Sequence, residues 1–208
     1  MYIKDPAQIE SDSMDIIGNE MPPHSFNEQE LLVVKRMIHT TGDFEYQEIV
    51  RFNHQPIASG IKAIQGGCRV VTDTMMAYSG INKRMLEKAK CTIDNYVADD
   101  EAFRMAKEKG TTRSMAAIDL AAEKGVDIFV IGNAPTALYR IGELIQTKKI
   151  SPQLVIGVPV GFVGAAESKE YIRGFDYPTI TTKGRKGGSN VAAAVLNAII
   201  YAAVGRDA

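Results

Sequence analysis

Residues 153–169, QLVIGVPVGFVGAAESK, constrain the fold more than any other part of the chain. They open with the apolar run Leu154-Val155-Ile156, which is too short for a helix and rich in β-branched residues, and therefore predicts a buried strand. A turn with three glycines (157, 161 and 164) follows, and Ala165 begins a helix. A strand, a Gly-rich turn and a helix start expose backbone N–H groups at the carboxyl edge of a sheet, which suits an anionic ligand.

A second unit of the same kind precedes it. Residues 127–131 predict a strand, Gly132-Asn133-Ala134 a turn, and Pro135 occupies the first position of a helix. Two such units in succession predict one cleft with two glycine-lined walls. The residues expected to line it are Gly132, Asn133, Ala134, Gly161 and Gly164.

Length and charge restrict the class of protein. At 208 residues and 22.7 kDa, the chain suits one α/β domain, and no linker divides it. We expect residues 1–25 to form an N-terminal arm, irregular or with a short helix, and residues 26–208 to form the α/β core. The formal net charge of −1 gives no support to nucleic-acid binding.

Neither membrane insertion nor a metal site is predicted. The longest apolar tract, residues 191–204, is interrupted by Asn197 and is shorter than the roughly 20 residues that a membrane span needs. The N-terminus lacks the apolar core of a signal peptide, so we expect a cytoplasmic protein. Cys68 and Cys91 have no partner at metal-binding spacing, and we interpret them as buried reduced thiols.

Strands alternate with helices along the chain, which predicts a doubly wound, largely parallel sheet with helices on both faces. The five expected strands are residues 68–72, 91–93, 127–131, 154–156 and 179–182. We expect the order third, second, first, fourth, fifth, with the binding crevice between the first and third strands. Residues 44–51 and 56–64 are expected to be helices.

Asp73 and Thr74 follow the first expected strand and are site candidates by position alone. Upstream, Asn27 caps a helix that Gly42 ends, which places His39 in the last turn. Unpaired carbonyls there favour the imidazolium form, the useful state for a proton donor. The alternative is a helix-terminal histidine that contributes only to stability.

Arg113 is expected in the first turn of a helix capped by Thr112, where the helix dipole disfavours a cation. It is either a ligand for a carboxylate or phosphate, or one half of a surface ion pair. Arg185 lies in a junction rich in glycines and cations before the last helix. This junction lacks the order of a phosphate-binding loop, and no dinucleotide-binding fingerprint follows the first strand.

Several motifs, taken together, resemble one family: the precorrin-8X methylmutases, including the cobalt-precorrin-8 methylmutases of the anaerobic cobalamin pathway. The motifs follow the family's order and spacing over nearly the whole chain, and the run PVGFVGAAESK is long enough to be very specific. The motifs are Arg36-Met37-Ile38-His39 with Gly42, Gly110-Thr111-Thr112-Arg113-Ser114, Ile131-Gly132-Asn133-Ala134-Pro135, PVGFVGAAESK from Pro159 to Lys169, and Gly184-Arg185-Lys186-Gly187-Gly188-Ser189.

The resemblance implies an enzyme with a three-layer α/β/α fold that moves a methyl group of the corrin ring from C11 to C12, giving cobyrinic or hydrogenobyrinic acid. It implies a homodimer that needs no added cofactor. His39 matches the family's catalytic histidine and Arg113 its carboxylate-binding arginine, although Thr111 stands where some relatives carry Asn. A serine of the family's N-terminal segment falls on Ser13.

The family is thought to run a suprafacial 1,5-methyl shift, in which protonating a ring nitrogen would lower the barrier. A macrocycle fringed with carboxylates also fits several N–H, arginine and lysine groups around one cleft. One alternative is a corrinoid carrier without chemistry. Another is a nucleotide or sugar-phosphate enzyme, against which the missing fingerprints count.

Overall fold

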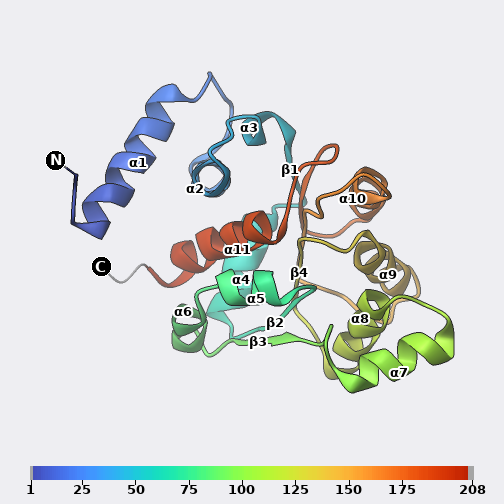
Figure 1. Ribbon diagram of the computed structural model, residues 1–208. Helices are drawn as coiled ribbons and strands as arrows, with labels where there is room; N and C mark the ends of the chain where they lie inside the picture. The colour runs from blue at the N-terminus through green and yellow to red at the C-terminus, as the bar shows by residue number, and fades with distance from the viewer. Residues whose placement is uncertain (1, 206–208) are drawn as a thin grey trace.

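The computed structural model describes residues 2–205 as one mixed sheet between two layers of helices (Figure 1). The strands are β1 (Val50–Asn53), β2 (Arg69–Thr72), β3 (Thr92–Asn95), β4 (Ile128–Ile131), β5 (Leu154–Gly157) and β6 (Thr179–Thr182). They lie in the order β1-β6-β5-β4-β2-β3. All neighbours run parallel except β1, which pairs antiparallel with β6. The expected α/β/α architecture is thus confirmed, with six strands instead of five.

The expected strand order is wrong in one respect. The third predicted strand, β4, pairs directly with β2 and β5, and the second, β3, lies at the edge. Every side chain of β4 (IFVI) is buried, which requires neighbours on both sides and helices on both faces. The strand β3 (TIDN) is polar and partly exposed, as suits an edge.

The expected helix over residues 44–51 is also wrong. Only one turn forms, α3 (Tyr46–Ile49), and the chain then enters β1. This strand pairs with β6 from Val50↔Thr182 to Asn53↔Thr179, so it closes the sheet edge next to the last parallel strand. Pairing across the sheet, which local propensity does not report, decides its conformation.

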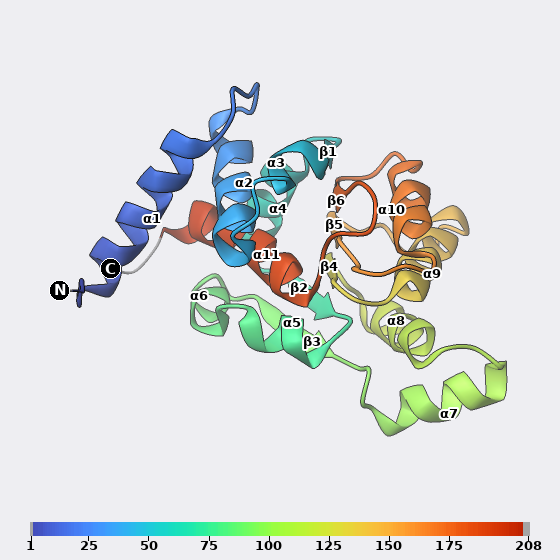
Figure 2. The same cartoon turned by 45° about the horizontal axis from the view of Figure 1, so that its top comes forward.

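The helices on one side of the sheet are α1 (Pro6–Glu20), α2 (Glu28–Thr41), α4 (Pro56–Gln65), α5 (Met75–Gly80), α6 (Lys83–Lys88) and α11 (Ser189–Val204). The Ala-rich α11 packs on α2, α4 and α5 and is buried along most of its length. The predicted arm is the regular 15-residue helix α1, capped by Asp5. It lies on the outer side of α2 (Figure 2), held by the Arg36–Glu10 ion pair of 2.8 Å.

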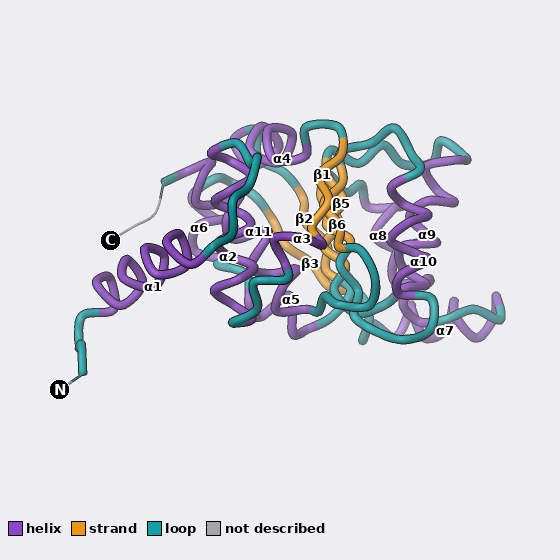
Figure 3. The backbone as a smooth tube through the Cα atoms, turned by 90° about the horizontal axis from the view of Figure 1, so that it is seen from above, coloured by secondary structure: helices purple, strands orange, loops and turns teal. Residues whose placement is uncertain are grey.

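The other face carries α7 (Asp100–Lys109), α8 (Arg113–Lys124), α9 (Pro135–Gln146) and α10 (Ala165–Arg173). Seen from above, the strands form a thin central layer between the two groups of helices (Figure 3). Each group has its own apolar core against the sheet, with Val70 facing one core and Val71 the other. This alternation is the two-residue period of a strand buried on both faces. No helix among the described residues is long and apolar enough to cross a membrane.

The chain diverges between β2 and β4. From β2 it crosses to β3 through α5 and α6 on one face, whereas from β4 it crosses to β5 through α9 on the other. Neighbouring strands whose connections leave in opposite directions form a topological switch point, where ligands of open α/β sheets bind. The first and third predicted strands therefore flank the switch point, as expected, despite the error in strand order.

Candidate functional site

The sequence candidates, with one exception, lie at the carboxyl edge of the parallel strands. The loops that follow β2, β4, β5 and β6 end at this edge, and α8 begins there because its chain leads into the start of β4. The end of α2 reaches the same edge, since the chain passes through α3 to Val50, which pairs with Thr182 at the end of β6.

Asp73 holds the loop that follows β4. Its buried carboxylate accepts hydrogen bonds from the backbone N–H groups of Gly132 (2.9 Å), Asn133 (2.8 Å) and Ala134 (2.8 Å). Burial raises the pKa of Asp73, and the three N–H donors oppose that rise. The expectation that these N–H groups are open to an anionic ligand is therefore wrong, because Asp73 already occupies them.

Thr74 joins this loop to the start of α11. Its hydroxyl caps α5 by accepting from the N–H of Ala77 at 3.0 Å, and lies 2.7 Å from the hydroxyl of Ser189. A side chain on Gly132 would place its Cβ 2.5 Å from the Cα of Ser189. This glycine is needed for close backbone packing between two loops.

The β6–α11 loop, residues 183–188, contacts most of the other segments at this edge. The backbone N–H of Lys183 donates to Ile49, and that of Gly188 donates to Val158 at 2.8 Å. The N–H of Gly161 donates in turn to the carbonyl of Arg185 at 3.1 Å. The glycine-rich β6–α11 loop is thus hydrogen-bonded to the end of α3 and to the β5–α10 loop, and it connects these two parts of the site.

The β5–α10 loop, residues 158–164, presents an exposed apolar tip. Phe162 is 81% exposed and Val163 is 90% exposed, between Gly161 and Gly164, which both have positive φ (152° and 76°). The guanidinium of Arg185 lies over the Phe162 ring, 5.1 Å from its centroid. An arginine held on an aromatic face keeps N–H groups at its edge that can bind a carboxylate.

Arg113 has a similar setting. It is the first residue of α8, after the capping Thr112, and its guanidinium lies 4.6 Å from the centroid of the half-exposed Phe103 ring. The hydroxyl of Thr112 donates to that of Thr136 at 3.1 Å, which ties this helix start to the helix after the Asp73-bound loop. Among the described residues, the Arg113 guanidinium therefore stacks on an aromatic ring and does not form the surface ion pair that was the alternative.

His39 is exposed in the last turn of α2, after the buried Met37 and Ile38. The helix has the expected capping box at Asn27 and ends at Gly42, whose φ is 65°. Partial burial and the positive charge of Arg36 lower the pKa of His39. The expectation that the helix end favours the imidazolium is therefore wrong, because partial burial of the ring, and to a smaller degree the cation one turn earlier, outweigh the carbonyl dipoles.

Two lysines that support the site were missed as functional residues. Lys186 donates to Asp43 at 2.5 Å and to Glu45 at 2.7 Å, directly after the helix of His39, and these hydrogen bonds raise the pKa of Lys186. Lys169 is fully buried beneath the same loop. A signal for Lys169 was present, because Ala165, Ser168, Lys169 and Ile172 follow the spacing of a buried helix face.

Ser13 is the exception to this grouping. It lies in the middle of α1, where its hydroxyl donates to the carbonyl of Ile9 at 2.7 Å. The hydrogen bonds between α1 and α2 run through Lys35 to Met14 and through Arg36 to Glu10.

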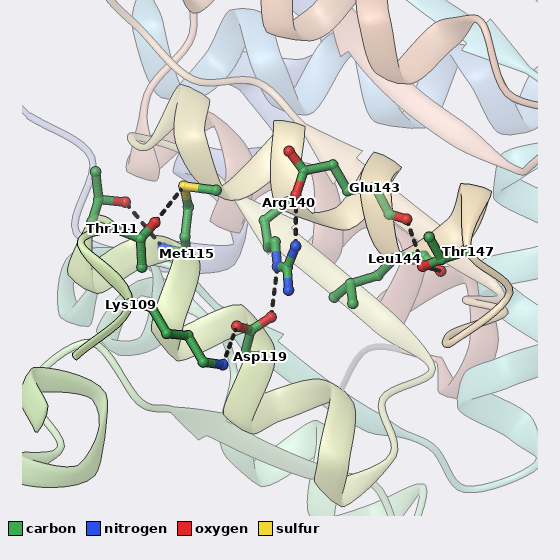
Figure 4. Close-up of polar contacts among 9 residues, drawn as sticks. Lys109, Thr111, Met115, Asp119, Arg140, Glu143, Leu144 and Thr147 are labelled. Atoms are coloured by element: carbon green, nitrogen blue, oxygen red, sulfur yellow. Dashed lines mark hydrogen bonds and ion pairs between the residues drawn. The ribbon is translucent and has the colours of Figure 1, made fainter. Parts of the chain in front are cut away.

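A second polar cluster lies away from this edge, on α7, α8 and α9 (Figure 4). The Asp119 carboxylate accepts from Arg140 at 2.6 Å and from Lys109 at 3.1 Å. Burial raises the pKa of Asp119, but the two cations outweigh it and hold the pKa below its usual range. The cluster pins three helices together beside a pocket of about 250 Å³, and it takes no part in the candidate site.

The chain is similar over nearly its whole length to known proteins of one family. The family model of precorrin-8X methylmutase matches residues 8–202. A cobalt-precorrin-8 methylmutase of Leptospira interrogans is 44% identical over 92% of this chain and 91% of its own, and that of Salmonella typhimurium is 44% identical over 96% and 97%. A precorrin-8X methyl mutase structure from Thermus thermophilus superposes with a TM-score of 0.89 at 40% identity, covering 97% of this chain and 98% of that chain. The chain belongs to the precorrin-8X methylmutase family.

Proposed function

We propose that the protein is an isomerase of cobalamin biosynthesis that moves a methyl group from C11 to C12 of cobalt-precorrin-8 or precorrin-8X. The observation that carries this is the family match over residues 8–202 together with the 44% identity to two cobalt-precorrin-8 methylmutases. The product is cobyrinic or hydrogenobyrinic acid, and any cobalt belongs to the substrate.

The test is incubation of the purified protein with cobalt-precorrin-8, followed by absorption spectroscopy. An enzyme converts the spectrum to that of cobyrinate with catalytic amounts of protein. A carrier binds the corrinoid stoichiometrically and leaves its structure unchanged, so that outcome would contradict the proposal. The nucleotide alternative is weakened further, because Asp73 occupies the backbone N–H groups that a phosphate would use.

In this reaction His39 supplies the proton or hydrogen bond that redistributes the π-electrons of the ring. Its exposure at the carboxyl edge supports this role. Because the pKa of His39 is lowered, the imidazolium is present mainly on the acidic side of its ordinary value of about 6.5. The reaction is accordingly favoured by mildly acidic conditions.

The remaining residues orient the ring. Arg113 and Arg185 are the proposed carboxylate clamps, each stacked on a phenylalanine. Asp73 acts by shaping the loop of Gly132 and Ala134, and not through contact with the ring. Further proposed substrate contacts at the carboxyl edge are Thr74, Gly132, Asn133, Ala134, Gly161 and Gly164. Ser13 is proposed from the family resemblance alone, because α1 lies away from this edge.

Arg113→Ala should weaken corrinoid binding by about 1.5–3 kcal/mol, the range for a hydrogen bond to a charged group. Titration calorimetry with cobyrinate measures the loss. Arg104→Ala removes an exposed arginine of the neighbouring helix α7 and serves as the matched control. Equal affinity in the Arg113 variant and the wild type would remove this residue from the site.

We also propose a homodimer, as the family resemblance implies, in the cytoplasm. Exposed apolar side chains on α1 and α2 support it: Ile9 is 45% exposed, Ile16 is 55% exposed and Leu32 is 54% exposed. Leu32 lines a groove with Arg36, Ala198 and Tyr201, between α2 and α11. Light scattering after size exclusion at several concentrations measures the assembly, and a monomer at all of them would contradict the dimer.

A further inference from the structure

Lys169 is a lysine in an unusual place. Its side chain has no exposed surface, although it belongs to the class of residue that is almost never fully buried unless paired with an acid. No carboxylate within residues 2–205 forms an ion pair with it. Its ammonium instead donates to the hydroxyl of Thr182 at 3.1 Å and to the carbonyl of Lys186 at 2.9 Å.

These contacts make a closed triangle under the β6–α11 loop. The hydroxyl of Thr182, which accepts from Lys169, donates to the same Lys186 carbonyl at 2.7 Å. The carbonyl therefore accepts two hydrogen bonds, one of them assisted by a positive charge. This fixes the backbone at Lys186 from the side of the loop that faces the protein interior.

The opposite side of the loop grips the helix of His39. The Lys186 ammonium bonds to Asp43 and Glu45, and the hydroxyl of Tyr46 donates to the carbonyl of Gly187 at 3.4 Å. Asp43 directly follows Gly42, the residue that ends α2. Contacts thus run without interruption from Lys169 through Lys186 to the end of the helix that carries His39.

The same loop also sets the place of Arg185. Its carbonyl accepts from Gly161, and its guanidinium lies on Phe162 of the β5–α10 loop. The backbone at Gly187 packs so tightly against Val158 that a Cβ would lie 2.0 Å from the Val158 carbonyl oxygen. A loop packed this closely transmits a displacement at Lys186 to both neighbours.

We propose that Lys169 is a positioning residue: its buried ammonium fixes the β6–α11 loop, and the loop in turn sets the positions of Arg185 and of the end of α2 that carries His39. The inference rests on the proposed function of those two residues. Lys169 has no exposed surface through which to meet the substrate, so it acts only through the loop.

The charge state of Lys169 provides a readout that is independent of catalysis. Burial and then the charge of Arg173 in the same helix lower the pKa of Lys169 to about 8. The groups that face the Lys169 ammonium are the neutral hydroxyl of Thr182 in β6 and the backbone carbonyl of Lys186 in the loop. The side-chain charge of Lys186 is paired with Asp43 and Glu45. Arg51 of β1 is a further cation, which acts on Arg173.

The lowered pKa of Lys169 makes the stability of the folded protein depend on pH. Because the pKa in the folded state is below that of an unfolded lysine, the folded protein gains stability as pH rises from about 8 toward 10.4. Lys169→Met lacks this gain.

The experiment compares the wild type, Lys169→Met, Lys186→Met, the double variant and Lys183→Met. Lys183 is an exposed lysine of the same loop and is the matched control. We expect Lys169→Met to bind cobyrinate and turn over cobalt-precorrin-8 about 10–100-fold less well, which corresponds to a small misplacement of reacting groups. We expect Lys186→Met to act in the same direction, and the double variant to fall short of the product of the two effects.

Amide hydrogen exchange in the absence of corrinoid separates this inference from the proposed function. In Lys169→Met, the amides of residues 39–45 and 183–188 should exchange faster than in the wild type, and exchange elsewhere should be unchanged. This result is expected even if the protein proves to bind no corrinoid. Lys186→Met alters a half-exposed side chain and tests the second half of the contact chain should Lys169→Met not fold. Wild-type exchange in both segments, or fully multiplicative effects of the two substitutions, would overturn the inference.

Discussion

His39→Ala should bind cobalt-precorrin-8 and fail to convert it, with turnover lower by a factor on the order of 10²–10⁴, the usual cost of losing one positioned proton donor. The helix should persist, because alanine is a good helix former, Met37 and Ile38 stay buried, and the N–H of Gly42 still bonds to Ile38. Binding should survive because the proposed carboxylate clamps lie on other elements. Single-turnover absorption measurements, with calorimetry for affinity, separate the two effects.

The pH dependence of the wild type gives a second measure of His39. Since burial and Arg36 lower the pKa of His39, turnover should rise as pH falls through a value below the ordinary 6.5 or so. Arg36→Met removes the repelling cation and should move this transition toward higher pH. His24→Ala, a substitution in an exposed loop, is the matched control and should behave like the wild type. Near wild-type turnover in His39→Ala, or unfolding of that variant, would refute the assignment.

Asp73→Ala should lower the free energy of unfolding by about 3–5 kcal/mol. Its carboxylate accepts from three backbone N–H groups at a buried position, and each donor left without an acceptor costs about 1–3 kcal/mol, partly relieved by relaxation. Asp73→Asn should cost less than alanine but remain destabilising, because its NH₂ group would face one or more of these donors. Urea unfolding at constant slope measures both losses.

Asp176→Ala provides the control for this prediction. Asp176 has a side chain that is 96% exposed and pairs with His54 at 3.0 Å, and such surface pairs contribute about 0–1 kcal/mol. Asp73→Ala should also bind corrinoid more weakly, at temperatures where the variant is folded, because its loop at Gly132 is no longer held. An unchanged urea midpoint would show that the carboxylate does not hold the loop.

Local signals in the sequence determined most of the elements and the region of the site. The capping residue Asn27 and the terminating Gly42 defined α2 because capping is a property of neighbouring residues. The two strand-turn-helix units located the carboxyl edge, because apolar runs, glycine turns and helix starts are also signals carried by neighbouring residues. The family motifs then identified His39 and Arg113 as the site candidates.

Tertiary structure decided what depends on distant partners. The strand β1 exists because β6 is beside it, and β4 is central because both faces and both edges are covered. The N–H groups of Gly132 to Ala134 were expected to be open, and only the folded chain shows Asp73 bonded to them from 59 or more residues away. The lowered pKa of His39 likewise results from burial, which a helix-end argument does not contain. Short-range patterns report backbone conformation, whereas solvent exposure and hydrogen-bond partners are fixed only when remote segments pack together.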